Sequence, residues 1–295
     1  MSLILITGST GQVGSALMAL SIKKGLHAIG TTHKQLNITD DESVEYYISK
    51  YNPSLVINAA AYTDVDKAEE DIDNAFLVNK IAVANLARAC QKKEIPLLHI
   101  STDYIFSGDK TIPYTELDDA NPESIYGDSK LAGEKEIQRF LDKYIILRTS
   151  WVFSSVGKNF PKSILHLARE RESLSIVDDQ FGGPTWAGDI AKVLMDIADN
   201  YLQKKNMHWG VYHYSGAPVT NWFEFAKEIM NRAKTLNIID SMPGLLAIPS
   251  EAYPALAGRP KYAVLDCSKI SQTYGINQVD WHIGLDKVLA EWKTQ

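Results

Sequence analysis

Near its N-terminus the chain reads Leu3-Ile4-Leu5-Ile6-Thr7-Gly8-Ser9-Thr10-Gly11-Gln12-Val13-Gly14. The apolar run that ends at Thr7 predicts a short buried strand, and apolar residues at helical spacing over residues 12–24 predict a helix. The glycines therefore fall in a strand-to-helix turn, where they let the backbone approach the pyrophosphate of a dinucleotide at the helix N-terminus. A turn that needs glycine only for a positive φ is the alternative. The residues predicted to contact a dinucleotide here are Gly8, Gly11, Gln12, Val13 and Gly14.

Strands and helices alternate over the first 150 residues. Further strands are predicted at residues 28–30, 55–60, 97–101 and 144–149, and helices at residues 75–91 and 131–140. This order predicts an α/β fold with a Rossmann-type, doubly wound parallel sheet.

The second half of the chain is less regular. It predicts helices at residues 159–171, 189–200 and 221–236 and a strand at residues 210–214, and proline and glycine become frequent after residue 241. We therefore expect two interleaved domains. A dinucleotide-binding domain spans residues 1–154, with residues 186–215 returning to it, and a smaller substrate-binding domain is built from residues 155–185 and 216–295.

Composition restricts the class of protein. The 295 residues are 45% hydrophobic and 22% charged, which is ordinary for a globular protein, and the formal net charge is −6. A negative charge argues against a nucleic-acid partner, which would require a basic face. No apolar run approaches the roughly 18 residues of a membrane span, and the chain enters a strand directly rather than a signal peptide, so we expect a cytoplasmic protein without a membrane partner. Cys90 and Cys267 lack metal-ligand spacing.

A tyrosine and a lysine four residues apart, Tyr126 and Lys130, form a second informative pattern. If this segment is helical, both side chains lie on one face, one turn apart. A charge about 4 Å from the phenol is worth roughly 4 kcal/mol at an effective dielectric of about 20, and would lower the tyrosine pKa by up to about three units, close to working pH. Thr102 follows a predicted strand at the edge where open α/β sheets bind ligands, and we expect it to hydrogen-bond the reacting oxygen. A solvated helix surface is the alternative for the tyrosine and lysine.

The segment after the predicted second strand bears on the choice of cofactor. It reads Gly30-Thr31-Thr32-His33-Lys34 and contains no carboxylate. A carboxylate at this place binds the ribose of NAD and repels a 2′-phosphate, whereas these side chains can accept one. We therefore expect NADPH at least as readily as NADH, with Thr31 among the contacts.

These motifs follow the order typical of a known superfamily. The glycine turn, Asn58-Ala59-Ala60-Ala61, Ser101-Thr102-Asp103-Tyr104-Ile105-Phe106 and Tyr126-x-x-x-Lys130 resemble the extended short-chain dehydrogenase/reductases. More narrowly, the chain resembles the dTDP-4-dehydrorhamnose reductase family in four longer segments, at residues 61–69, 126–134, 147–153 and 179–185. The resemblance extends to Arg259-Pro260 and to Trp281, and so covers nearly the whole chain.

The resemblance implies reduction of the C4 ketone of dTDP-4-dehydro-L-rhamnose to give dTDP-L-rhamnose. By position, Tyr126 is implied as the proton donor, and Lys130 as the residue that holds the tyrosine and the nicotinamide ribose. Thr102 and Asp103 are implied to lie against the sugar. Trp151 is implied to pack on that sugar, or else is a core aromatic at a strand end.

The resemblance also implies binding residues away from the reacting atoms. Asn37 and Ile38 match a pair that contacts adenine, with asparagine where many relatives have aspartate. Further residues beside the cofactor are Ala61, Tyr62 and Thr63. Arg259 is implied to bind the nucleotide phosphates, because a guanidinium fork fits them well, or else forms a surface ion pair.

Alternatives to this function remain open. Another nucleotide-keto-sugar reductase or an epimerase of the same fold would share every motif up to the sugar contacts. A non-catalytic, NADP-binding regulatory subunit or an NADPH sensor would share the glycine turn but does not need the Thr102, Tyr126 and Lys130 set. Some relatives dimerise through a magnesium ion held partly by an acid on the first helix, where this chain has Ala16, so we predict no metal and leave monomer and homodimer open.

Overall fold

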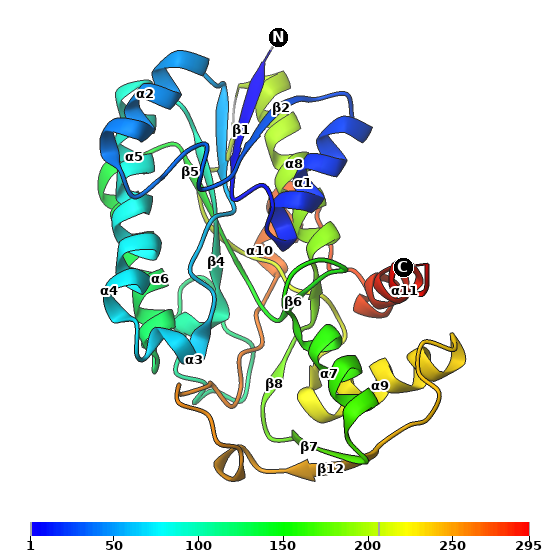
Figure 1. Ribbon diagram of the computed structural model, residues 1–295. Coiled ribbons are helices and arrows are strands. Elements are labelled where there is room, and N and C mark those ends of the chain that lie inside the picture. The colour runs from blue at the N-terminus through cyan, green and yellow to red at the C-terminus, as the bar shows by residue number, and fades with distance from the viewer. Residues whose placement is uncertain (1, 206, 295) are drawn as a thin grey trace.

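The apolar run at the N-terminus forms an inner strand of a parallel sheet. The structure is a computed structural model, and it describes residues 2–205 and 207–294. Six strands form this sheet in the order β10-β5-β4-β3-β1-β2, and each neighbouring pair is parallel. They are β1 (Leu3–Thr7), β2 (His27–Thr31), β3 (Leu55–Asn58), β4 (Leu97–Thr102), β5 (Tyr144–Thr149) and β10 (Gly210–His213). The predicted α/β fold with a doubly wound parallel sheet is confirmed (Figure 1).

Helices cover both faces of the sheet because side chains along each strand alternate between two cores. In β1, Ile4 and Ile6 join one hydrophobic cluster and Leu5 joins the other. The first cluster is covered by α1 (Gln12–Lys23), α8 (Ala187–Lys204) and α10 (Ser268–Tyr274). The second is covered by α2 (Asp41–Tyr51), α5 (Ala82–Lys92) and α6 (Ile125–Phe140) (Figure 1).

A smaller lobe lies beyond the carboxyl edge of the sheet (Figure 1). Its hydrophobic cluster joins α7 (Phe160–Glu170), α9 (Trp222–Thr235) and α11 (Trp281–Lys293) to the parallel pair β7 (Ser173–Val177) and β12 (Gly244–Ile248). Short strands complete the connections, namely β6 (Val152–Phe153), β8 (Phe181–Gly182), β9 (Thr185–Trp186) and β11 (Thr220–Asn221).

The helix predicted at residues 131–140 begins six residues earlier, at Ile125. Its N-cap is Ser124, whose Oγ accepts a hydrogen bond from the Gly127 amide at 3.2 Å. Serine is a strong N-cap residue, so this boundary had a signal in the sequence. The earlier start places Tyr126 in the first turn and Lys130 one turn later on the same helix.

Other elements differ from expectation. The helix predicted at residues 75–91 is divided into α4 (Ile72–Phe76), a π-helical turn (Leu77–Ile81) and α5. Helix α2 was not predicted, although Asp40 caps it by accepting from the Glu42 amide at 3.2 Å. The pair β7 and β12 was not predicted either, since its strands lie far apart in sequence. The remaining short turns are α3 (Val65–Ala68), η2 (Asp103–Ile105) and η3 (Ser250–Ala252).

The interleaving of the two halves is visible in the contacts. After the smaller lobe begins, the chain returns to pack α8 on α1 and to add β10 beside β5 at the sheet edge. The domain limits at residues 154, 185 and 215 stay a prediction. Among the helices that the structure describes, none is long and apolar enough to cross a membrane.

Candidate active site

The carboxyl ends of β1, β3, β4 and β5 border a cavity of about 480 Å³. Most residues predicted for catalysis and for the reactive end of the cofactor line it: Gly11, Gln12, Val13, Ala61, Thr63, Thr102, Asp103, Tyr126, Lys130 and Trp151. The structure thus brings together segments that are far apart in sequence. The other predicted residues lie outside this lining: Gly8, Gly14, Thr31, Asn37, Ile38, Tyr62 and Arg259.

The glycine turn between β1 and α1 has the shape that a dinucleotide pyrophosphate requires. Gly8 has φ of +65°, and a Cβ there would lie 2.7 Å from Ala60 Cα; a Cβ on Gly14 would lie 2.0 Å from the Gly8 oxygen. These two glycines therefore let the turn close on itself and on the segment after β3. Gly11 is the N-cap and supplies no side-chain cap, and no acid occupies the first turn of α1. The first amides of α1 are left to bind an anion, so the turn fits the cofactor.

Gln12, at the first position of α1, also ties the turn to the smaller lobe. Its Oε1 accepts from Ser154 Oγ at 3.0 Å and from Asn159 Nδ2 at 3.0 Å. Both donors lie between β6 and α7. The loop at one side of the cavity is therefore held by the same residue that begins the phosphate-binding helix.

Lys130 is 2% exposed and lies deep beneath the cavity. Its Nζ donates to the Ile100 carbonyl at 2.7 Å and contacts His99 Nε2 at 3.2 Å. Tyr126, one turn earlier, packs its ring edge-on against Tyr104 with a centroid separation of 5.5 Å. The tyrosine, the lysine and Thr102 of β4 all line the same cavity, as predicted for a reductase site.

The expectation that Lys130 lowers the pKa of Tyr126 is wrong for this structure. Burial raises the pKa of Tyr126 to about 12, Asp103 acts in the same direction, and the Thr102 hydroxyl acts against it. Lys130 does not offset the burial, because its Nζ binds the Ile100 carbonyl and its own pKa is lowered by burial to about 8. A phenol with a raised pKa keeps its proton at neutral pH and can still donate it.

Polar atoms without partners gather at the cavity. Within residues 2–205 and 207–294, the buried atoms Ser101 Oγ, Asp103 Oδ2 and Thr149 Oγ1 have no hydrogen-bond partner, and all three residues line the cavity. Thr102 Oγ1 donates to Asp103 Oδ1 at 3.1 Å, and burial raises the pKa of this carboxyl to about 7. Buried polar atoms are nearly always paired, so their gathering here indicates a polar ligand that completes the site.

Trp151 adopts a left-handed backbone conformation with φ of 44°, which is unusual for a large side chain. Its indole stacks on Trp222 with ring centroids 3.5 Å apart and planes at 11°. A Cβ on Gly182 would lie 2.7 Å from Trp151 Cε2, so a glycine is needed at that contact. Trp151 and Trp222 both line the cavity, and packing of Trp151 on a sugar stays a prediction.

Thr31 requires a correction, because its side chain cannot reach a ligand. It is 1% exposed, and its Oγ1 donates inward to the Ile6 carbonyl at 3.4 Å. As the last residue of β2 it points into the sheet interior, because side chains alternate along a strand. The exposed side chains that follow, His33 and Lys34, are the ones free to meet a 2′-phosphate.

The residues predicted near adenine, Asn37 and Ile38, and Tyr62, predicted beside the cofactor, all take part in hydrogen bonds within the protein. Asn37 Oδ1 accepts from the Thr39 amide at 3.2 Å, and Asn85 Nδ2 donates to the Ile38 carbonyl at 3.1 Å. Tyr62 donates its amide proton to Asn79 Oδ1 at 2.9 Å. Their contacts with a cofactor stay predictions.

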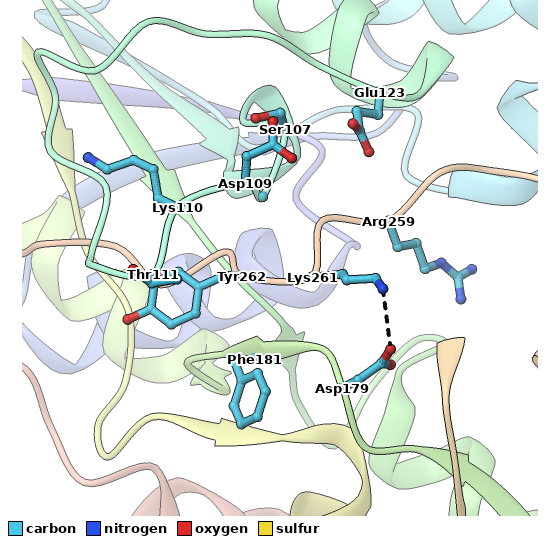
Figure 2. A pocket seen from close by; sticks show the side chains of 11 residues that line it. Ser107, Asp109, Lys110, Thr111, Glu123, Asp179, Phe181, Arg259, Lys261 and Tyr262 are labelled. Atoms are coloured by element: carbon cyan, nitrogen blue, oxygen red, sulfur yellow. Dashed lines mark ion pairs between the residues drawn. The ribbon is translucent and has the colours of Figure 1, made fainter. Parts of the chain in front are cut away.

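Arg259 lines a different cavity, of about 670 Å³, which is formed mainly by residues 107–111 together with Asp179, Phe181, Lys261 and Tyr262 (Figure 2). Its Nη2 forms an ion pair with Asp66 Oδ2 at 2.6 Å, which is the alternative considered from the sequence. The buried Nε of Arg259 has no partner in the described part of the chain. In the same cavity Lys261 Nζ lies 3.8 Å from Asp179 Oδ2 (Figure 2). A phosphate contact by Arg259 stays a prediction.

Several cavity residues were missed by sequence reasoning. Trp222 and Lys158 reach the cavity from the smaller lobe, and Thr149 reaches it from β5. The strand-end position of Thr149 repeats that of Thr102 and could have indicated it. For Trp222 and Lys158 the sequence carries no signal, because only the packing of the lobe on the sheet brings them to the site.

A tyrosine, a lysine and a strand-end hydroxyl beside the phosphate turn of a doubly wound sheet are typical of short-chain dehydrogenase/reductases, whose extended group this chain resembles in its motifs. This oxidoreductase class is the one that the fold and the cavity define. Within the class, the family described as "RmlD substrate binding domain" matches residues 1–294, and the chain belongs to that family.

Relatives support the assignment over the full length. The chain is 40% identical to a dTDP-4-dehydrorhamnose reductase of Aggregatibacter actinomycetemcomitans, covering 98% of this chain and 99% of the relative. A crystal structure of the Clostridium acetobutylicum enzyme of that name is similar, with a TM-score of 0.90, 35% identity and coverage of 98% and 99% of the two chains. A Bacillus anthracis dTDP-4-dehydrorhamnose reductase, solved in complex with NADP, has a TM-score of 0.89, 34% identity and coverage of 99% and 100%.

Proposed function

We propose that this protein reduces the C4 ketone of dTDP-4-dehydro-L-rhamnose with NADPH, giving dTDP-L-rhamnose. The observation that carries the proposal is one cavity that joins an uncapped helix N-terminus to Tyr126, Lys130 and unpartnered polar atoms. The first feature suits a dinucleotide, and the second suits a carbonyl substrate that must receive a proton. The naming of full-length relatives supports the choice of sugar.

The proposed roles follow from the positions of the side chains. The amides that begin α1 would hold the pyrophosphate, and Ala61 and Thr63, which line the cavity, would contact the cofactor. When bound, NADPH supplies the hydride. Tyr126 donates its proton to the carbonyl oxygen, since its raised pKa keeps the phenol protonated at working pH.

Thr102 and Asp103 are proposed to orient the sugar. Thr102 Oγ1 is placed at the carboxyl end of β4, and its contact with Asp103 fixes the hydroxyl beside the reacting group. The free Oδ2 of Asp103 is proposed to bind a sugar hydroxyl. Positioning of this kind lowers the barrier by holding the reactants in a productive geometry.

A stopped assay with purified dTDP-4-dehydrorhamnose and NADPH tests the proposal. We expect one NADPH oxidised per substrate, and mass spectrometry and NMR should identify dTDP-rhamnose as the product. An epimerase would interconvert sugars without net oxidation of NADPH. Tight NADPH binding without turnover of any 4-keto nucleotide sugar would instead support a regulatory subunit.

We also propose a cytoplasmic location and a monomeric or homodimeric state. Cell fractionation tests the location. Light scattering of the purified protein over a range of concentrations tests the assembly.

A further inference from the structure

Lys130 is held by a buried polar chain that runs through two strands of the sheet. Its Nζ contacts the Ile100 carbonyl at 2.7 Å and His99 Nε2 at 3.2 Å, both from β4. The other ring nitrogen, His99 Nδ1, lies 3.0 Å from Asn58 Nδ2 at the end of β3. His99 and Asn58 are both fully buried, and the catalytic roles proposed above make no use of either.

The orientation of the Asn58 amide is fixed by its other neighbours. Its Oδ1 accepts from the Ala60 backbone amide at 3.1 Å, and a backbone N–H can only donate. Thr7 Oγ1 donates to the same oxygen at 2.6 Å. Turning the amide over would bring Nδ2 against the Ala60 N–H. Asn58 therefore presents Nδ2 to His99 as a donor.

This donor decides which nitrogen of His99 carries the proton. Burial, together with the charge of Lys130, lowers the pKa of His99 well below its usual value, so the ring is neutral. A neutral imidazole has one N–H and one acceptor nitrogen. Because Nδ1 accepts from Asn58, Nε2 must carry the proton, and it points at Lys130 Nζ. An ammonium group has no lone pair to accept that proton, whereas a neutral amine has one.

We propose that His99 is a positioning residue for Lys130: with its tautomer set by Asn58, it directs an N–H at Nζ and thereby favours the amine over the ammonium form. Lys130 then changes charge within the working range of the enzyme instead of staying a permanent cation. Its contact with the Ile100 carbonyl holds Nζ in place in either form, because both forms donate.

Other charged groups around Lys130 act in both directions. Glu134, one turn later on α6, favours the ammonium, but its carboxylate is engaged by Arg148 of β5 at 2.7 Å. Tyr126 and Asp103 face the same cavity, and both have raised pKa values, so Tyr126 is uncharged at neutral pH. Burial, the largest effect, lowers the pKa of Lys130 to about 8, in the direction that the His99 N–H requires.

The substitution Asn58→Asp reverses the direction of the hydrogen bonds from residue 58 through His99 to Lys130, with little change in side-chain shape. A carboxylate still accepts from Ala60 and Thr7 but offers no N–H, so His99 must carry its proton on Nδ1 and present Nε2 as an acceptor. The Lys130 ammonium can then donate to it, and we expect the titration of Lys130 to move up by about one pH unit or more. His99→Gln should act in the same direction, since the amide can turn its oxygen toward Nζ. Asn231→Asp, on an exposed part of α9, adds the same charge as a control.

The readout is the Nζ signal of ¹⁵N-lysine-labelled, cofactor-free protein followed against pH, with the signal assigned by its loss in Lys130→Met. This measurement needs no turnover, so its failure is distinct from failure of the proposed reductase function on which the inference rests. We also expect the pH profile of kcat/KM to change. The apparent pKa assigned to Lys130 should rise in Asn58→Asp and His99→Gln, but not in the control. Unchanged Lys130 titration in both folded variants would overturn the proposal. If neither variant folds, the wild-type protein decides: an ammonium that persists to about pH 10, its ordinary range, contradicts the inference.

Discussion

Tyr126 keeps its proton because it lies in a cavity from which water is partly excluded. Its pKa of about 12 makes it a weaker acid than the sequence predicted, and the Thr102 hydroxyl is the group that opposes the shift. Proton transfer from a positioned side chain typically contributes about 10²–10⁴-fold to the rate. We therefore expect catalysis to depend on the phenol hydroxyl of Tyr126 rather than on its ring.

We predict that Tyr126→Phe reduces kcat by about 10²–10⁴-fold, because general acid catalysis contributes a factor of that size. NADPH affinity should change by only a few-fold, since the ring and its packing on Tyr104 are retained. Single-turnover kinetics and NADPH fluorescence titration measure the two quantities. A variant that keeps more than about a tenth of wild-type kcat, with chemistry rate-limiting, would remove Tyr126 from the role of proton donor.

We expect the choice between NADPH and NADH to depend on exposed residues after β2. Thr31 is buried, so replacing it with an acidic residue would bury a charge. The result would then report the cost of that burial rather than recognition of the cofactor. His33 and Lys34 are exposed, and one charge-assisted hydrogen bond to a 2′-phosphate is worth about 1.5–3 kcal/mol, roughly tenfold or more in affinity.

We predict that the wild-type protein prefers NADPH in kcat/KM and that His33→Asp shifts the preference toward NADH, because a carboxylate repels the phosphate. His33→Asn is the matched control, which removes the imidazole without adding charge and should retain the NADPH preference. Steady-state kinetics with both cofactors at low salt measure the ratio. A wild-type preference for NADH would contradict this interpretation of the loop.

At the scale of an element, the turn from β1 to α1 depends on close backbone contacts. A Cβ on Gly14 would lie 2.0 Å from the Gly8 oxygen and 2.8 Å from Ser9 Cα, which are backbone atoms that cannot move aside separately. Any side chain there must open the turn or shift the start of α1. The geometry of the pyrophosphate site and the packing of the helix are thus set by the same residue.

We therefore predict that Gly14→Ala lowers NADPH affinity by at least tenfold, because an opened turn no longer aims the α1 amides at the pyrophosphate. The free energy of unfolding should also fall, by about 1–3 kcal/mol, as expected for overpacking. Gly244→Ala is the control, since a Cβ there meets only ordinary contacts at 3.8 Å. Calorimetric titration and urea unfolding measure both effects. Tight NADPH binding by Gly14→Ala would show that the turn tolerates a side chain.

At the scale of the whole molecule, His213 joins the last strand of the sheet to its neighbours. Its Nδ1 donates to the Tyr114 carbonyl at 3.0 Å, and its Nε2 accepts from Arg148 Nη1 at 3.4 Å. Both ring nitrogens are satisfied when the ring is neutral, and a second proton would face the Arg148 guanidinium. Burial, and then Arg148, lower the pKa of His213 to about 3.

This histidine makes stability depend on pH in a known direction. Between its unfolded pKa of about 6.5 and its folded value, only the unfolded chain takes up the proton, so stability falls as pH falls through this window. We predict that His213 alone costs about 2 kcal/mol of stability between pH 7 and pH 5.

The test compares the pH dependence of unfolding in wild type and His213→Asn, which keeps a donor for the Tyr114 carbonyl but does not titrate. The loss between pH 7 and pH 5 should be smaller in the variant by about 2 kcal/mol, and groups such as Asp103 cancel in the difference. His27→Asn, at an exposed position of β2, should keep the wild-type slope. Equal slopes in wild type and His213→Asn would contradict the lowered pKa.

Local pattern was enough to predict the strands of the parallel sheet and most of the helices around it, but not α2. A strand such as Leu3–Thr7 is buried throughout and apolar from Leu3 to Ile6, because both faces of the sheet are covered. A glycine turn before a helix predicts the phosphate site. The four-residue spacing of Tyr126 and Lys130 predicted their shared helix face. These features depend on residues that are close together along the chain, so the sequence alone is enough to predict them.

Only the tertiary structure decided the direction of each pKa and the partners of each buried group. The sequence places Lys130 beside Tyr126 but cannot show that Nζ binds Ile100 and His99 from another element. It also cannot show that Thr31 points inward or that Trp222 stacks on Trp151. The physical reason is that desolvation and hydrogen bonding are set by atoms brought together from distant parts of the chain, whereas secondary structure is set mainly by local periodicity.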